Sequence, residues 1–158
     1  SWFCLSLFWR SGIELPAYPG VSNLTSVMKI LVVDDSAMMR SVIKSTLASY
    51  GSGKQIEVVE AVNGQEALDK LASESIDLVL LDWQMPVVDG LECCRLLKQN
   101  PQTQRIPVIF LTARNQQSDL DEAINAGAIG YIVKPFDAKE LCNEILKIYN
   151  KHLWSQSA

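Results

Sequence analysis

The sequence predicts a parallel α/β fold, and two features of the chain carry this prediction. Short apolar runs alternate with amphipathic, helix-like stretches from Met28 onward. Most of these runs are continuously apolar, which is typical of strands covered by helices on both faces of a sheet. The runs predicted as strands are KILVV (29–33), IEVVEA (56–61), IDLVLL (76–81), IPVIFL (106–111) and IGYIV (129–133).

The first predicted helix follows the first strand. Met39, Ile43, Leu47 and Tyr50 recur at helical spacing, so we expect the face that they share to pack on the sheet. Gly51 follows as a stop signal.

Later helices carry start and stop signals of their own. Asn63 with Glu66, and Asp137 with Glu140, have the spacing of a capping box at a helix N-terminus. Gly127 is a candidate for the left-handed residue that ends the helix before the last strand.

Length and composition predict one globular domain. The chain has 158 residues, of which 48% are hydrophobic, enough for one ordinary core. We expect residues 28–153 to form this domain and 154–158 to be a short tail. Residues 1–27 show no sustained period and no signal-peptide pattern, so we expect an extension without ordered structure.

Several classes of function are disfavoured by the charge pattern, the apolar runs and the cysteines. The 14 basic and 18 acidic residues form no block of like charge, which predicts no nucleic-acid partner. No apolar run approaches the roughly 20 residues that cross a membrane. The four cysteines lack metal or disulfide spacing, which favours a reducing cytoplasm, and Cys93 and Cys94 are expected to be buried. His152, the single histidine, is not expected to bind metal or act as a base.

Polar side chains follow four of the predicted strands. Asp34 and Asp35 follow the first, Asp82 the third, Thr112 the fourth and Lys134 the fifth. Taken singly, each has an ordinary interpretation as a helix cap, a turn residue or a solvated strand end. Because ligands bind at the carboxyl ends of the strands in an open parallel sheet, their joint occurrence indicates a site.

The residue types at this edge predict a magnesium site for phosphoryl chemistry. Three carboxylates about 5 Å apart repel by about 3 kcal/mol per pair at an effective dielectric of about 20, so the cluster implies a cation. Oxygen ligands without His or Cys suit Mg²⁺, with Mn²⁺ as an alternative. Lys134 and the Thr112 hydroxyl would then bind an anion such as a phosphoryl group. A Gly-rich phosphate loop is not found, so nucleotide is not the expected donor.

Four motifs contain these residues: LVVDDS (31–36), LLDWQMPVVDG (80–90), FLTA (110–113) and GYIVKPF (130–136). In order and spacing they resemble the motifs of bacterial response-regulator receiver domains, most closely the stand-alone, CheY-like kind of chemotaxis. The resemblance covers residues 28 to about 150. It implies a flavodoxin-like (βα)5 fold with strand order 2-1-3-4-5.

The resemblance also implies a role for each acidic residue. Asp82 would be the nucleophile that accepts the phosphoryl group. Asp35 and Asp82 would bind Mg²⁺ directly, together with the backbone carbonyl of Gln84. Asp34 would act mainly through bound water.

Further roles are implied for residues of the last two strands. Lys134 would pair with Asp82 at rest and with the phosphoryl group afterwards, and the bond from Lys134 to Pro135 would be cis. Thr112 would move to bind the phosphoryl oxygens while Tyr131 turns inward, which together would form the switch.

Two positions next to these residues are left open. Gln84 and Arg114 lie two residues past Asp82 and Thr112, where the family varies. Arg114 would either contact the phosphoryl group or project into solvent, and the lifetime of the phosphorylated state does not follow from either residue.

Three functions compete. The leading hypothesis is a cytoplasmic, monomeric signalling receiver, phosphorylated by a histidine kinase or histidine phosphotransfer protein and read out by an effector that the sequence does not identify, with chemotaxis as one pathway. Such a receiver turns over no separate substrate. A Mg²⁺-dependent phosphatase or phosphotransferase is the second, although the chain lacks an insertion to cover a substrate pocket. The third is a receiver separated from a DNA-binding regulator.

Overall fold

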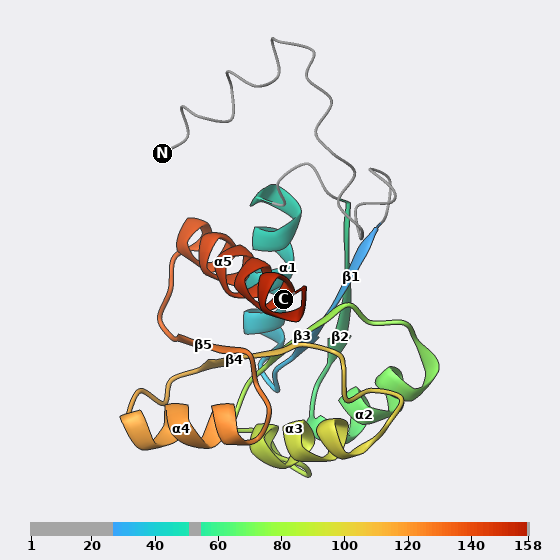
Figure 1. Cartoon of the computed structure of the whole chain (residues 1–158). Coiled ribbons are helices and arrows are strands. Elements are labelled where there is room, and N and C mark those ends of the chain that lie inside the picture. The colour runs from blue at the N-terminus through green and yellow to red at the C-terminus, as the bar shows by residue number, and fades with distance from the viewer. Residues whose placement is uncertain (1–26, 51–54, 158) are drawn as a thin grey trace.

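Five parallel strands form one sheet in the order β2-β1-β3-β4-β5 in the computed structural model, which describes residues 27–50 and 55–157. This confirms the predicted flavodoxin-like fold and strand order. Helices cover both faces of the sheet, with α1 and α5 together on one side and α2, α3 and α4 on the other (Figure 1). The strands are β1 (Met28–Val33), β2 (Ile56–Ala61), β3 (Leu78–Leu81), β4 (Val108–Thr112) and β5 (Gly130–Val133). The helices are α1 (Ala37–Tyr50), α2 (Gly64–Ser73), α3 (Gly90–Gln99), α4 (Gln117–Asn125) and α5 (Ala138–Gln156).

Each central strand contributes to two hydrophobic cores. Leu31 and Val33 of β1 pack in the core under α2 and α3, whereas Ile30 and Val32 pack in the core under α1 and α5. Neighbouring residues of a strand point to opposite faces, so a strand between two cores must be apolar at every position. This is why the apolar runs predicted the strands.

The observed ends of β4 differ by a residue or two from the predicted strand. The strand begins at Val108 because Pro107 has no N–H to give to the ladder, although its carbonyl accepts a hydrogen bond from Val79 N at 3.0 Å. Its last residue is Thr112, which pairs with Val133 of β5.

The predicted helix signals are found with one difference. Asp137 Oδ1 accepts the Glu140 N–H at 2.8 Å, and Asn63 Oδ1 accepts the Glu66 N–H at 2.8 Å, as caps of α5 and α2. The Glu66 carboxylate, however, accepts from Val62 N at 3.0 Å and not from its cap residue. Gly127 has φ +103°, which confirms the left-handed stop after α4.

The first helix packs as predicted at three of its four named residues, and the side chain of Tyr50 lies outside what the structure describes. Ile43 and Leu47 are buried in the core beside α5, and Met39 packs against the same core. The proposed stop at Gly51 lies outside the described residues, as do residues 1–26 of the predicted extension.

The last helix extends beyond residue 153, the predicted end of the domain. Helix α5 continues to Gln156, so three residues of the predicted 154–158 tail are helical. Neither Gly nor Pro interrupts residues 138–156, and the helix therefore continues into solvent, where Trp154 is 69% exposed. None of the helices in the described part of the chain has the length and apolar character needed to cross a membrane.

Candidate functional site

The predicted acidic residues meet at the carboxyl edge of the sheet. Each of Asp34, Asp35 and Asp82 offers a carboxylate oxygen, and these oxygens all lie within 4.8 Å of one another. The pairing of β1 with β3 brings them together, because Asp82 N donates to Val33 O at 2.9 Å directly beside Asp34. Asp34 and Asp82 are only 2% and 8% exposed, whereas Asp35 is open to solvent. An all-oxygen set with one open side fits a hard, partly hydrated divalent cation.

Lys134 partly neutralises this cluster from the end of β5. Its Nζ lies 2.8 Å from Asp34 Oδ2 and 3.7 Å from Asp82 Oδ2. The ion pair that was expected, Lys134 with Asp82, therefore has the longer of the two distances, and Asp34 is the closer partner of Lys134. The Asp34 side chain is the more buried, 3% exposed against 11% for Asp82, and a charge pair is stronger where less water screens it.

Backbone contacts place Lys134 at the same edge as Thr112. Lys134 N donates to Thr112 O at 2.9 Å, which continues the β4–β5 pairing past the end of β5. The peptide bond between Lys134 and Pro135 is cis, as expected.

The carboxylate of Asp82 is held in one orientation. Its Oδ1 accepts the Trp83 N–H at 2.8 Å, which leaves Oδ2 toward Lys134. Burial raises the pKa of the Asp82 carboxyl above its ordinary value; Lys134 opposes the rise and Asp34 adds to it. The surroundings of Asp82 therefore favour its neutral form more than water does.

This raised pKa predicts that Asp82→Asn stabilises the metal-free protein. A folded-state pKa above the unfolded value means that the free energy of unfolding falls as the pH rises through the interval between the two. Asn does not titrate, so the variant avoids this loss of stability. We expect the melting temperature of Asp82→Asn in EDTA to exceed that of the wild type by a few degrees at pH 7. The difference should shrink as the pH approaches about 4, near the unfolded pKa of aspartate. Thermal unfolding at both pH values measures it, and a less stable variant at pH 7 would contradict the prediction.

The two predicted switch residues both contact the backbone of Arg114. Thr112 is 1% exposed, and its Oγ1 accepts the Arg114 N–H at 3.3 Å. The Tyr131 hydroxyl donates to the Arg114 carbonyl. The Tyr131 ring packs beside Phe110, with ring centroids 6.5 Å apart, so Tyr131 is a core aromatic whose hydroxyl reaches the loop after β4.

The Arg114 side chain does not simply project into solvent, which was one of the two alternatives left open by the sequence, and its contact with a phosphoryl group stays a prediction. Its guanidinium lies over the Trp83 ring, 4.6 Å from the centroid, and Nη1 is 2.8 Å from Asp119 Oδ1 in the first turn of α4. The loop after β4 is thereby tied to the loop after β3, which begins at Asp82. Gln84 is exposed, and its carbonyl as a metal ligand stays a prediction.

Two residues that the sequence did not indicate also shape the site. Arg40 of α1 donates from Nη1 to the Asp34 carbonyl at 2.7 Å. Gly90 packs so closely that a Cβ there would lie 2.1 Å from the Asp82 carbonyl oxygen and 2.8 Å from Trp83 Cα. The motif containing Gly90 was visible in the sequence, but no sequence signal marked the contact of Arg40.

The predicted burial of Cys93 and Cys94 is confirmed. Cys93 and Cys94 are fully buried, and burial raises their pKa values to about 12 and about 11, so they behave as apolar residues.

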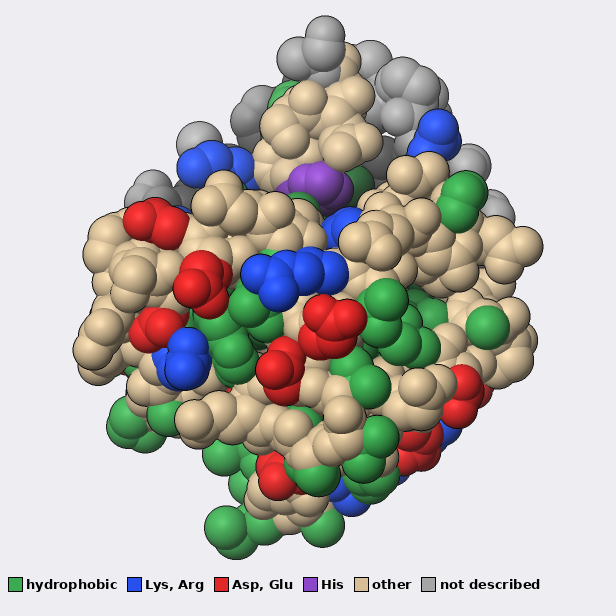
Figure 2. All heavy atoms as spheres, turned by 90° about the horizontal axis from the view of Figure 1, so that it is seen from below, with side chains coloured by type: hydrophobic (Ala, Val, Ile, Leu, Met, Phe, Trp, Pro, Cys, Tyr) green, Lys and Arg blue, Asp and Glu red, His purple; other side chains and the backbone are tan. Residues whose placement is uncertain are grey.

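On the face shown in Figure 2, acidic and basic side chains are interspersed with hydrophobic ones, without a continuous basic surface over its described part.

The fold and the acidic edge define a class of protein, a parallel α/β domain with a cluster of three aspartates at the carboxyl ends of its strands. Within this class, the chain belongs to the response regulator receiver domain family of two-component systems, whose match covers residues 30–146.

Relatives with the same domain include chemotaxis proteins. The chain is 37% identical to chemotaxis protein CheY of Pseudomonas aeruginosa over 124 residues, which cover 78% of this chain and 98% of that protein. It is 35% identical to chemotaxis protein CheY-3 of Vibrio cholerae over 128 residues, covering 81% and 96%. The phosphate regulon transcriptional regulatory protein PhoB of Rhizobium meliloti is 40% identical over 113 residues, 72% of this chain, which spans only 48% of PhoB.

Solved structures show the same fold. The chemotaxis protein CheY4 of Vibrio cholerae superposes with a TM-score of 0.69 at 30% identity, over 78% of this chain and 99% of that chain. A putative response regulator of Chloroflexus aurantiacus gives a TM-score of 0.71 at 30% identity, over 78% and 98%. The chain is thus a CheY-like receiver domain in both sequence and fold.

Proposed function

We propose that this receiver accepts a phosphoryl group on Asp82, in a Mg²⁺-dependent reaction, from a histidine kinase or a histidine phosphotransfer protein. The observation that carries the proposal is the set of three carboxylates within 4.8 Å, with the Lys134 ammonium 2.8 Å and 3.7 Å from two of them. Such a set can bind a cation and an anionic phosphoryl group together, which is what phosphoryl transfer requires of a protein.

Each residue has a separate part in this reaction. Oδ2 of Asp82, which faces Lys134, forms the new bond to phosphorus. The bond from phosphorus to the donor's histidine nitrogen breaks, and its electron pair stays on that nitrogen. Lys134 and the Thr112 hydroxyl then bind the phosphoryl oxygens.

The metal ligands of the proposal are those implied by the family. Asp35 and Asp82 would hold Mg²⁺ with the Gln84 backbone carbonyl, and Asp34 would act through water. Bound there, Mg²⁺, or Mn²⁺ in its place, supplies positive charge that offsets the carboxylate repulsion and the charge of the phosphoryl group.

Phosphorylation would act on partner binding through the loop after β4. A phosphoryl group adds nearly two negative charges and new acceptor oxygens, which would draw the Thr112 hydroxyl toward it. Thr112 and Tyr131 both form hydrogen bonds to the backbone of Arg114, and the Arg114 side chain pairs with Asp119 of α4. A movement of Thr112 would therefore be transmitted to the start of α4. The output would be binding to an effector, with no separate substrate turned over.

Intact-mass measurement after incubation with acetyl phosphate tests this function. With Mg²⁺ we expect one phosphoryl adduct per chain, and with EDTA in place of Mg²⁺ we expect none. Sustained phosphate release over many turnovers would instead support the phosphatase alternative, and no adduct under any metal condition would refute the proposal.

The names of the relatives favour a pathway but not a partner. Two of them are chemotaxis proteins, so we propose chemotaxis as the pathway. Affinity capture with and without beryllofluoride, which mimics the phosphoryl group, would identify the effector. The cytoplasmic location and the monomeric state stay predictions.

A further inference from the structure

Asp34 is held at every polar atom that it has. Its N–H donates to Ala61 O at the end of β2 (3.1 Å), and its carbonyl accepts from Arg40 Nη1 (2.7 Å). Its Oδ1 accepts the Ser36 N–H (2.8 Å), and its Oδ2 pairs with Lys134 (2.8 Å). The turn that presents the acidic pair is therefore fixed from four directions.

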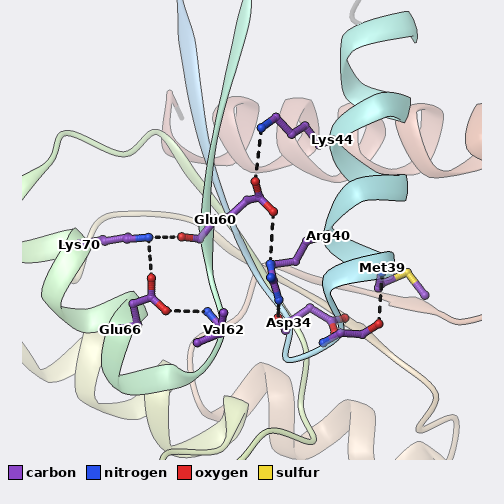
Figure 3. A network of polar contacts seen from close by, with 9 residues as sticks. Asp34, Met39, Arg40, Lys44, Glu60, Val62, Glu66 and Lys70 are labelled. Atoms are coloured by element: carbon purple, nitrogen blue, oxygen red, sulfur yellow. Dashed lines mark hydrogen bonds and ion pairs between the residues drawn. The ribbon is translucent and has the colours of Figure 1, made fainter.

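Arg40 adds a second contact between this turn and the edge strand β2, beside the hydrogen bond from Asp34 N to Ala61 O. Figure 3 shows its side chain between Asp34 and Glu60, with Nε 3.2 Å from Glu60 Oε1. The Arg40 side chain is 13% exposed, so water screens this contact less than an ordinary surface pair. One guanidinium thus binds the acidic turn and β2 at once, which its forked geometry permits.

Glu60, the anchor of Arg40, is itself fixed by two lysines. Lys44 Nζ lies 3.3 Å from Glu60 Oε2, and Lys70 donates to the Glu60 carbonyl while pairing with Glu66 at 2.7 Å. The end of β2 is therefore connected both to α1, through Lys44, and to α2, through Lys70 (Figure 3).

We propose that Arg40 is a positioning residue for the metal site, which orients Asp35 by holding the carbonyl of Asp34. That carbonyl belongs to the planar peptide unit that leads into Asp35, so fixing its oxygen fixes where the Asp35 side chain starts. Asp35 is solvent-exposed and needs this backbone restraint to bring its carboxylate to the other two. The inference rests on the proposed Mg²⁺ binding and adds to it a residue that touches neither metal nor phosphoryl group.

Electrostatics and positioning make opposite predictions for removal of Arg40. Losing a positive charge near three carboxylates would, by Coulomb attraction alone, tighten Mg²⁺ binding. Losing the restraint on the peptide would weaken it, since groups that orient metal ligands are typically worth 10- to 100-fold in affinity. The direction of the change in Mg²⁺ affinity therefore distinguishes a purely electrostatic effect of Arg40 from a positioning effect.

The test is calorimetric titration of Mg²⁺ into the full chain and its variants. For Arg40→Met we expect about tenfold weaker binding. The matched control is Lys44→Met, which also loses a positive partner of Glu60 but has no contact with Asp34, and we expect its affinity to stay within about twofold of wild type. Arg40→Lys keeps the charge but not the fork, so it should also bind several-fold more weakly.

Amide hydrogen exchange in EDTA gives a second measurement that needs no metal. The Ser36 N–H bonded to Asp34 Oδ1 should exchange faster in Arg40→Met than in Lys44→Met, because the turn opens locally. Unchanged or tighter Mg²⁺ binding in both Arg40 variants, or equal losses in Arg40→Met and Lys44→Met, would overturn the inference. Failure of the wild type itself to bind Mg²⁺ would instead refute the proposed function.

Discussion

Asp82→Asn is expected to abolish phosphorylation by acetyl phosphate in the presence of Mg²⁺. The amide has no anionic oxygen to attack phosphorus, yet its carbonyl can still accept the Trp83 N–H that holds Asp82 Oδ1 at 2.8 Å. The fold should therefore be retained while the nucleophile is lost. We expect the rate of adduct formation, followed by intact mass, to fall by at least about 10³-fold.

The control for this variant is Asp69→Asn. Asp69 is an exposed aspartate of α2 whose carboxylate accepts from Gln65 Nε2 at 3.0 Å, so it has the same chemistry outside the acidic cluster. This variant should form the adduct like the wild type. A full adduct on Asp82→Asn would place the phosphoryl group elsewhere and remove Asp82 from its role.

Gly90→Ala is expected to destabilise the protein by about 3 kcal/mol or more. A Cβ at this position would lie 2.1 Å from the Asp82 carbonyl oxygen, 2.8 Å from Trp83 Cα and 2.9 Å from the Asp82 carbonyl carbon. All three are backbone atoms, so the clash is relieved only if the loop after β3 moves. Because Gly90 N also donates to Trp83 O at 2.8 Å, that movement should displace Asp82. Urea unfolding measures the loss of stability, and Mg²⁺ titration should show weaker binding.

Gly130→Ala provides the matched comparison. The nearest atoms to a Cβ there all belong to the Ile148 side chain, from 2.4 Å outward, and a side chain can change rotamer where a backbone cannot. We therefore expect Gly130→Ala to cost clearly less than Gly90→Ala and to leave Mg²⁺ affinity unchanged. Equal losses of stability would show that the backbone contacts of Gly90 are not the cause.

The strands and the principal site residues could be predicted because a local pattern encodes them. Buried strands must be apolar at every position, and parallel strands deliver their next residues to one edge, which is where Asp34, Asp82, Thr112 and Lys134 lie. Helix caps such as Asp137 are equally local, since donor and acceptor are three residues apart. The strand order came from the family resemblance, because apolar runs alone do not say which strands are neighbours.

By itself, then, the sequence determined the fold class, the edge on which the site lies and the kinds of side chain that form it. Only the tertiary structure decided that Lys134 pairs more closely with Asp34 than with Asp82, and that Arg114 lies over Trp83. It also decided that Arg40 binds the Asp34 carbonyl. The physical reason is that each of these long side chains has several possible partners within reach. Burial and distance set the strength of each interaction, and both are defined only once the segments have packed together.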